Sequence, residues 1–540
     1  MDKNFFLAIF LSVLVYIGWF TLVEKKRPRP VREPAPPAAA GERSAPTTAA
    51  GGPARAVTPS LSPAQPDPAP AAGGLDGAMT FNIGGMELMI QPLGAAIVSY
   101  SYPGPLGPVD LIADPYPGFF ATWPELRFTR AGGDKNWPAF DAVHASGAQI
   151  RKEYLFQSPH SINSLRLTIT NPGKEPLRLP AFRLALGPGL GTVPTEQKEN
   201  SAQWQAVALL PSEKAGRSDE FVEFKNEEET VAHEGEWRWL GIQNRYFLSA
   251  IFPADSHFGR FEHGTRKKMV MTKSWLGQTK RGEALAPWLN AEASALDIGP
   301  GETVKLEIPF YFGPKGYSRL KAIGQGLERS VSFGWFHRLG RFTLYVLSTF
   351  HSWTNNWGWS IILLTICLQI IMFPLTYKST KSMVMMKKVA PEQAKLQQKF
   401  KGNPQRLNQE MMALYKRHNV NPLGGCLPML AQMPIFIALF NMLRNAWELH
   451  GAPWMLWVQD LSAADPYYVL PVVMGGIMFL QNKMTPVAGG DPNQAKMMQF
   501  MPIIFTFMFL NFPAGLVLYW LTNSILSFAQ QLIIKRQMGA

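Results

Sequence analysis

The chain has 540 residues, a formal net charge of +13 and 46% hydrophobic residues. Its mean hydropathy of −0.04 is high for a soluble chain and low for a pure membrane bundle, so we expect membrane and aqueous domains together. The two cysteines, Cys367 and Cys426, lie inside or beside apolar stretches, which excludes a disulfide framework outside the membrane. The basic residues gather beside apolar stretches, where they set orientation or contact anionic lipids, so no nucleic-acid readout is expected.

The first apolar stretch, Phe5 to Val23, is about long enough to cross a hydrocarbon core. A cleaved signal peptide is the alternative, but a basic run follows directly where small residues would form a cleavage site. We therefore predict that residues 1–24 are a retained transmembrane anchor. Residues 25–78 are rich in Pro and Ala and cannot bury enough apolar surface to fold, which predicts a disordered tether.

Residues 79–315 carry short runs that alternate between apolar and polar side chains, such as Met86 to Ile90, Ser164 to Thr170 and Thr303 to Phe312. This alternation predicts an antiparallel β-sandwich domain. Its histidines have no metal-ligand spacing, and the chain has no His-Glu-x-x-His motif and no phosphate-binding loop. We therefore expect neither an enzyme nor a metal or cofactor site.

Residues 316–352 mix Trp, Phe and Leu with Arg and Lys at helical spacing. Such a pattern predicts an amphipathic helix region in the membrane interface, and a buried helix of the β domain is the alternative. Beyond it, residues 353–540 contain five further apolar stretches: Trp357 to Tyr377, Leu427 to Leu443, Tyr467 to Gln481, Met497 to Leu510 and Gly515 to Ile534. With the anchor they predict six transmembrane helices, several of them short enough to thin the bilayer locally.

Between the first and second of these stretches, residues 378–417 carry ten Lys/Arg against two acids. By the positive-inside rule this loop lies in the cytoplasm, which also places both termini there and the β domain outside. Gly402-Asn403-Pro404 divides two helical patterns, with Asn403 suited to cap a helix and Pro404 to begin it, so we predict a helical hairpin over 378–420. The hairpin either sets topology alone or docks a ribosome, a substrate or anionic lipid, through Lys387, Lys388, Lys395, Lys399, Arg406, Lys416 and Arg417.

Polar side chains recur at helical spacing within the apolar stretches. One face is formed by Thr365, Gln369 and Thr376, a second by Asn523, Ser527 and Gln530 or Gln531, and further amides come from Gln432 and Gln499. Buried amides are costly in hydrocarbon unless they are paired or hydrated. Two interpretations stay open: hydrogen bonds that hold the helices together, or a water-filled cavity between at least three of them.

Several motifs of the C-terminal half occur in a characteristic order: Asn421 to Pro428, Gln432 to Phe436, Trp457 to Ser462, Asp465 to Tyr468, Phe500 to Pro502 and Phe512 to Trp520. Over about residues 330–540 the chain resembles the YidC-type membrane protein insertases. The anchor, tether and β domain are similar to the Gram-negative form of that family, which has a large periplasmic domain.

The resemblance implies a multi-pass protein of the bacterial inner membrane that inserts and helps fold integral membrane proteins, alone or with the Sec translocon. It implies five core spans around a hydrophilic groove open to cytoplasm and lipid, and nascent membrane proteins as partners. Groove-lining residues would be Thr365, Gln369, Gln432, Asn523, Ser527 and Trp520. The substrate contact surface would comprise Met433, Phe436, Met474, Phe505 and Met508.

The chain departs at two positions from the pattern of the family that it resembles. Gln369 stands where an arginine is usual, and Trp520 where a tyrosine is common. The alternative functions are a secondary transporter for a small solute, although the sequence shows no inverted repeat, and an anchored periplasmic sugar-binding or envelope-assembly protein.

Overall fold

The structure is a computed structural model that describes residues 77–537 with short gaps at 115, 133–136, 159, 194–195, 197–201, 213–218, 227–228, 254–256, 274–278, 401, 419–426 and 485–491. The predicted anchor and nearly all of the predicted tether lie outside the described residues, as does Asn421 to Cys426. Contacts divide the chain into two compact units, and the described part of the smaller one is residues 391–418 without 401.

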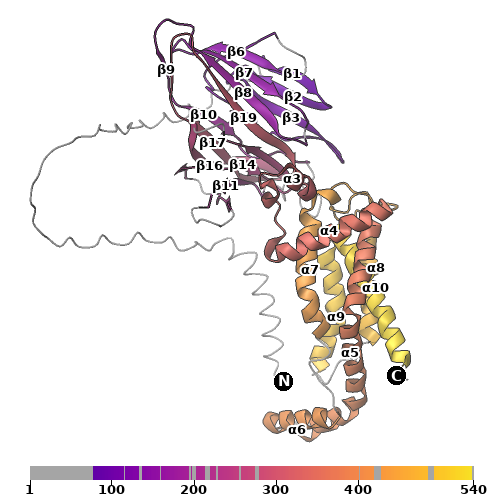
Figure 1. Ribbon diagram of the computed structural model, residues 1–540. Helices are drawn as coiled ribbons and strands as arrows, with labels where there is room; N and C mark the ends of the chain where they lie inside the picture. The colour runs from indigo at the N-terminus through magenta and orange to yellow at the C-terminus, as the bar shows by residue number, and fades with distance from the viewer. Residues whose placement is uncertain are drawn as a thin grey trace, which may run out of the picture. The chain divides into compact units, whose positions relative to one another are not determined.

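The N-terminal half of the described chain is β-rich, as predicted, and the strand pairings described are antiparallel (Figure 1). The first sheet has the order β1-β2-β3-β4 and contains β1 (Met79–Ile83), β2 (Met86–Gln91), β3 (Ala96–Gly104) and β4 (Gly107–Asp110). The largest sheet has the order β12-β11-β14-β15-β19-β8-β7-β6-β5. Its strands are β5 (Thr129–Arg130), β6 (Ala139–Val143), β7 (Gln149–Leu155), β8 (Asn163–Thr170), β11 (Gln205–Leu210), β12 (Glu220–Glu223), β14 (Trp239–Gln243), β15 (Phe247–Ile251) and β19 (Thr303–Pro314).

A third sheet has the order β10-β17-β16-β13, and one further pair completes the β region. These strands are β10 (Phe182–Leu186), β13 (Val231–Glu234), β16 (Phe258–Lys273) and β17 (Thr279–Ala293), with β9 (Leu177–Leu179) paired to β18 (Leu296–Ile298). Side chains from all three larger sheets enter one hydrophobic core.

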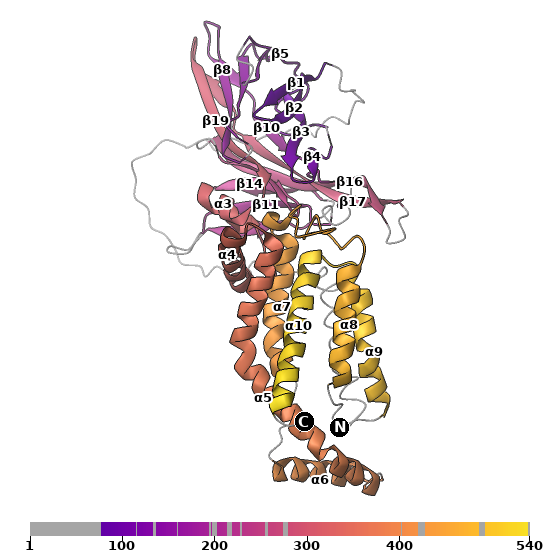
Figure 2. The same cartoon turned by 90° about the vertical axis from the view of Figure 1, so that its right-hand side faces the viewer.

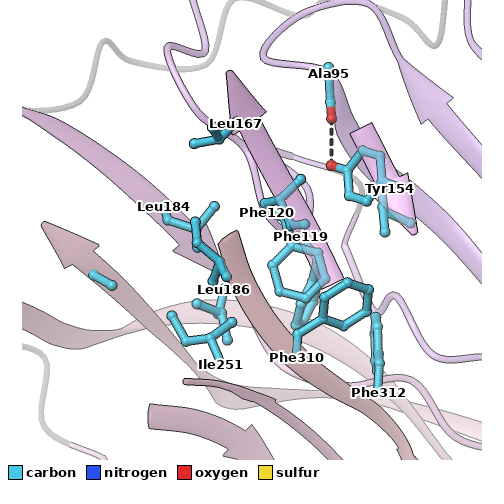
Figure 3. Packing of buried hydrophobic residues seen from close by; sticks show 14 of the residues in the cluster. Ala95, Phe119, Phe120, Tyr154, Leu167, Leu184, Leu186, Ile251, Phe310 and Phe312 are labelled. Carbon is cyan, nitrogen blue, oxygen red and sulfur yellow. Dashed lines mark hydrogen bonds between the residues drawn. The ribbon is translucent and has the colours of Figure 1, made fainter. Parts of the chain in front are cut away.

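Aromatic rings fill the centre of that core (Figure 3). The ring centroids of Phe119 and Phe312 lie 5.1 Å apart, and those of Phe120 and Phe310 lie 4.7 Å apart. The Tyr154 hydroxyl, which is fully buried, donates to the carbonyl of Ala95 at 2.6 Å, so its polar end is satisfied. The alternation read in the sequence over 164–170 is the alternation of buried and half-buried side chains along β8.

The region 316–352 is not one helix, which corrects the prediction of a continuous amphipathic segment. It contains α3 (Tyr317–Ile323), the 3₁₀ turns η5 (Leu327–Ser330) and η6 (Gly334–Phe336), and α4 (His337–Thr354). The breaks fall at Gly324, Gly326 and Gly334, which have φ of 81°, 73° and 69°. A side chain at those dihedrals is strained. Gly324 caps the C-terminal end of α3, Gly326 precedes η5 and Gly334 begins η6, so the glycines lie at the boundaries between the segments.

The predicted apolar stretches are all helical in the described chain (Figures 1 and 2). The helices are α5 (Trp357–Lys399), α6 (Pro404–Arg417), α7 (Leu427–Asn445), α8 (Val469–Met484), α9 (Pro492–Phe509) and α10 (Ala514–Gln537), with the short turn η8 (Trp447–Leu449). Within the described residues, two stretches, Trp357–Met386 and Ala514–Gln537, are long and apolar enough to cross a membrane, and two more are apolar but shorter. The six-span count therefore stays a prediction.

The predicted break in the basic loop is confirmed, but α5 does not stop at Tyr377. It runs on to Lys399, and α6 begins at Pro404. The Asn403 side chain accepts a hydrogen bond from the Arg406 backbone at 3.1 Å, as expected of a helix cap.

The β-rich domain and the helices share a second hydrophobic core. Trp239 of β14 is fully buried in this cluster, which also contains Leu320 of α3 and Leu439 of α7. Its indole N–H donates to the carbonyl of Gln325 at 3.1 Å. The face of the sheet that carries Trp239 is therefore covered by helices rather than by water.

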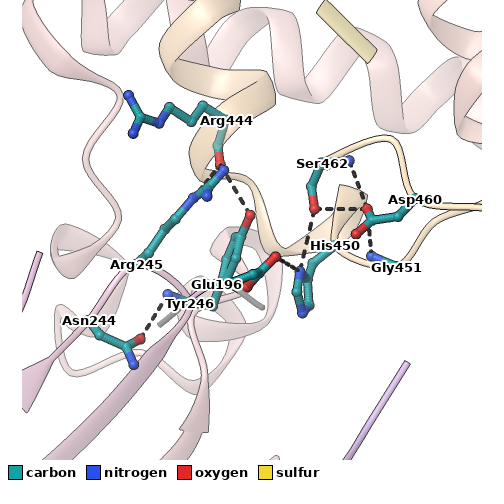
Figure 4. A network of polar contacts seen from close by, with 9 residues as sticks. All are labelled: Glu196, Asn244, Arg245, Tyr246, Arg444, His450, Gly451, Asp460 and Ser462. Carbon is teal, nitrogen blue, oxygen red and sulfur yellow. Dashed lines mark hydrogen bonds and ion pairs between the residues drawn. The ribbon is translucent and has the colours of Figure 1, made fainter. Parts of the chain in front are cut away.

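A polar network lies next to this core (Figure 4). The guanidinium of Arg245 donates from Nε to the carbonyl of Arg444 at 2.9 Å, and a second bond comes from Nη2. The carbonyls of a helix's last turn have no partner within the helix. Arg245 therefore satisfies the C-terminal end of α7, and it stacks on the ring of Tyr246, 4.6 Å from its centroid.

His450 joins the same network from the segment that follows η8. Its Nδ1 lies 3.5 Å from a carboxylate oxygen of Glu196 and 3.4 Å from the hydroxyl of Ser462. Burial lowers the pKa of His450 to about 4; the charge of Asp460 opposes this shift, and the weaker effect of Arg245 adds to it. We call this contact region between the β-rich domain and the end of α7 the junction. In the folded protein it favours the neutral imidazole of His450.

We predict that Arg245→Met lowers the free energy of unfolding by about 1–3 kcal/mol, because the end of α7 loses a charged hydrogen-bond donor. The measurement is the thermal and proteolytic stability of the purified chain in detergent. Arg238→Met is the matched control: its pair with Asp219 at 3.5 Å is exposed on the arginine side, so about 0–1 kcal/mol is expected. Equal losses in both variants would contradict the role given to Arg245.

Acid should weaken the junction through His450. Its folded pKa is about 4 against 6.5 in the unfolded chain, so its contribution is complete above pH 6.5 and is lost as pH falls from 6.5 toward 4. At pH 5 the loss is about 2 kcal/mol. The measurement is the difference in melting temperature between wild type and His450→Gln from pH 7 to pH 5. His263 acts in the same direction and is common to both chains, so parallel pH profiles would rule out this role of His450.

Candidate functional site

Polar side chains of α5 and α10 meet inside the helical region. Gln369 of α5 is 6% exposed, and its amide nitrogen donates to Ser527 Oγ at 2.8 Å and to Gln530 Oε1 at 3.1 Å. Ser527 and Gln530 lie about one turn apart on α10, so both reach the same amide. The structure thus brings two predicted groove residues together and selects Gln530 of the two glutamines that the sequence left open.

A second polar pair joins α7 to α10. The amide nitrogen of Gln432 donates to the hydroxyl of Tyr519. Tyr519 is 1% exposed and was not among the predicted site residues. In the sequence, Tyr519 appears only as a tyrosine within the run Phe512 to Trp520, where an aromatic side chain is as consistent with apolar packing as with a polar site. Helix α10 therefore supplies the partners for amides from two other helices.

The other predicted groove residues lie outside these pairs. Thr365 is 1% exposed, and its hydroxyl donates to the carbonyl of Ile361 in its own helix at 2.7 Å. Asn523 is half-buried, about one turn before Ser527. Trp520 packs among phenylalanines, with its ring centroid 5.0 Å from that of Phe436 and 5.4 Å from that of Phe509. Thr365 therefore caps a carbonyl of its own helix, and Trp520 belongs to an aromatic cluster.

The residues predicted to contact substrate differ in exposure. Met433 is 47% exposed and Met508 43% exposed. Phe436 and Phe505 are half-buried beside Trp520, whereas Met474 is fully buried in the shared core. Met433 and Met508 can therefore meet a neighbouring chain or lipid directly, and Met474 cannot do so in this conformation.

The basic hairpin presents its charges to solvent. Lys388, Lys395, Lys399, Arg406, Lys416 and Arg417 are exposed, and the side chain of Lys387 lies outside the described residues. Within the smaller unit, His418 lies 3.3 Å from Glu392, which links the end of α5 to the end of α6. This ion pair depends on the charge of His418 and is itself exposed.

The side chains of Glu196, His450 and Asp460 place potential metal ligands within 4.8 Å of one another. Their atoms already serve the junction: Asp460 Oδ1 accepts from the Gly451 backbone at 3.0 Å and from the hydroxyl of Ser462 at 2.8 Å. The nearby charge of Arg245 also disfavours a cation. Hydrogen bonding at the junction accounts for this cluster.

Chemically, the Gln369 and Gln432 pairs are neutral. They offer amide and hydroxyl groups within an apolar surrounding, and none of the five side chains carries a charge. Each amide is hydrogen-bonded across helices, so the interpretation as interhelical bonding fits these two residues. The same groups can exchange partners with a polar segment that enters between the helices.

Two family models match consecutive parts of the chain: the 60Kd inner membrane protein at residues 349–540 and the YidC periplasmic domain at residues 120–346. The membrane protein insertase YidC of Endomicrobium trichonymphae is 38% identical over 453 residues, 82% of each chain. That of Nitratidesulfovibrio vulgaris (strain DP4) is 34% identical over 571 residues, 99% of each.

A crystal structure described as an active YidC insertase with its first transmembrane domain resolved covers 84% of this chain and 91% of its own. It is 15% identical with a TM-score of 0.37, and at that score the likeness adds no argument. The two sequence relatives establish the family, since each exceeds 30% identity and the second alignment covers nearly all of both chains. The chain belongs to the YidC family of membrane protein insertases.

Proposed function

We propose that this chain inserts integral membrane proteins into the bacterial inner membrane and helps them fold, with its β-rich domain in the periplasm and both termini in the cytoplasm. Family membership supports the activity. The observation that carries the mechanism is the neutral cluster of Gln369, Ser527 and Gln530, which is buried between two helices that are apolar enough to span.

A polar or charged terminus is costly to move through hydrocarbon, about 3 kcal/mol or more for a charged side chain at the centre. In this proposal the terminus enters between α5, α7 and α10 and takes over the hydrogen bonds of Gln369 and Gln432. The helix pairs reform after it has passed, so their bonds act as a reversible seal. Because the cluster has no charge, neutral and acidic termini are received alike.

The hydrophobic part of the substrate would leave along the exposed methionines. Met433 and Met508 are unbranched and adaptable, which suits many different sequences. Thr365 and Asn523 border the path, and Trp520 with Phe436 and Phe505 forms its aromatic wall. Met474 supports this wall from the core and is left out of the contact surface.

In this proposal the basic hairpin is the docking surface on the cytoplasmic side, where the substrate arrives. Its exposed Lys and Arg suit a negatively charged partner, either anionic lipid head groups or ribosomal RNA during synthesis. Cooperation with the Sec translocon belongs to the same proposal. Neither role needs a nucleotide or a metal.

We expect Gln369→Leu to slow insertion about tenfold, because the hydroxyl and amide of α10 lose their partner and the path loses a polar group. Gln369→Arg should favour acidic over neutral translocated termini, which the wild type does not distinguish. The measurement is insertion of a small single-span precursor, with neutral or acidic termini, into liposomes that contain only the purified chain.

Thr376→Val is the matched control, since that hydroxyl bonds the carbonyl of Met372 in its own helix at 3.1 Å. It should change insertion less than about twofold. The mechanism is wrong if Gln369→Leu inserts both precursors as fast as the wild type.

Replacing Lys395, Lys399, Lys416 and Arg417 together by Gln should weaken docking to anionic liposomes or ribosomes at least about tenfold, since each such charge contributes about 1 kcal/mol near an anionic surface. Cosedimentation at several salt concentrations measures it. Lys174→Gln with Lys305→Gln, two exposed lysines of the β-rich domain, is the control. Unchanged docking would mean that the hairpin charges set topology only.

A further inference from the structure

A partly open cavity of about 310 Å³ lies where the β-rich domain meets the end of α7. Strands β11, β12 and the turn between β14 and β15 form one wall. The segment from η5 to η6 and the last two turns of α7 form the other. By volume it could hold about ten water molecules, at about 30 Å³ each. No step of the proposed insertion mechanism uses it.

Cationic side chains dominate the charge of this cavity. Among the described residues, Lys315, Arg245 and Arg444 line it against one carboxylate, that of Glu223. Amides from both walls, including Gln205 and Asn445, add hydrogen-bonding groups. This composition suits an anion with several oxygen atoms rather than an apolar or cationic ligand.

Lys315 gives the most specific indication. It is 7% exposed, and its ammonium group donates to Gln243 Oε1 at 2.8 Å and to the carbonyl of Asn244 at 3.1 Å. Both acceptors are neutral, and in the part of the chain that the structure describes no carboxylate lies within ion-pair distance of Nζ. Burial lowers the pKa of Lys315 to about 7, with Glu223 acting in the opposite direction.

A buried cation without a paired anion is costly. An ammonium group also has three hydrogens, of which two are used here. An anion in the cavity would accept the third and restore the charge balance. Arg245 also lines the cavity, and its hydrogen bond to the carbonyl of Arg444, drawn in Figure 4, holds its guanidinium in place.

We propose that this cavity binds the phosphate group of an anionic phospholipid at the periplasmic side of the membrane. The cavity includes Gly334 of η6, and the next residue, Trp335, is 67% exposed. On α4, which follows, Phe342 is 62% and Tyr345 71% exposed. Exposed aromatic side chains at the end of a membrane bundle lie at the level of lipid head groups, so a phosphate reaches the cavity from the lipid itself.

The test uses the purified full chain in detergent micelles. Native mass spectrometry measures retention of phosphatidylglycerol, and calorimetry measures binding of two soluble probes, glycerol 3-phosphate and inorganic phosphate. Phosphatidylglycerol should bind, and glycerol 3-phosphate should compete for the site. Arg444→Gln and Lys315→Gln should each weaken lipid binding about tenfold.

Arg338→Gln is the matched control, because Arg338 is exposed on the neighbouring α4 and does not line the cavity. Arg444→Lys should restore most of the binding, and melting temperatures verify folding. If Lys315→Gln does not fold, the comparison of Arg444→Gln with Arg444→Lys decides, since Arg444 is only half-buried and its replacement should be tolerated.

Lipid retention that is equal in Arg444→Gln, Lys315→Gln and wild type would overturn the site. Inorganic phosphate that binds as tightly as the lipid would overturn the lipid as occupant. Competition by an acidic peptide but by neither phosphate probe would overturn the phosphate chemistry.

Discussion

Polar side chains in an apolar bundle must find partners, and in this protein α10 provides them. Ser527 and Gln530 satisfy Gln369 of α5, while Tyr519 satisfies Gln432 of α7. A buried amide without a partner costs free energy comparable to a lost hydrogen bond or more, so the three helices are held in a definite register. The aromatic cluster around Trp520 is held in place by the same helix.

The β-rich domain is joined to the helices by packing as well as by chain connection. Trp239 is buried in a hydrophobic cluster that includes residues of α3 and α7, and Arg245 satisfies the end of α7. An insertase that exchanges hydrogen bonds between its helices needs those helices to return to one arrangement. Under the proposed mechanism, a sheet fixed to the end of α7 would give these helices a constant reference position.

Periodicity made the elements accessible from the sequence. Alternation over 164–170 and 303–312 predicted strands, and the Asn403-Pro404 pair predicted the start of α6. The division of residues 316–352 into four segments was not predicted. The amphipathic pattern continues across it, but three glycines with positive φ interrupt the helical backbone. Helix beyond Tyr377 was predicted as the first arm of the hairpin, but its continuity with the membrane span was not, because polarity ends a membrane span without ending a helix.

The sequence by itself determined which side chains are polar within apolar stretches, the basic character of the hairpin and the family. Only the tertiary structure decided that Gln369 bonds Ser527 and Gln530 and that Tyr519 meets Gln432. It also decided that Lys315 lines a cavity in which no carboxylate of the described residues pairs with its ammonium group. The physical reason is that periodicity assigns a residue to a face of its own helix or strand. Which neighbour that face meets depends on packing between segments far apart in the chain, and one sequence does not encode that as a local pattern.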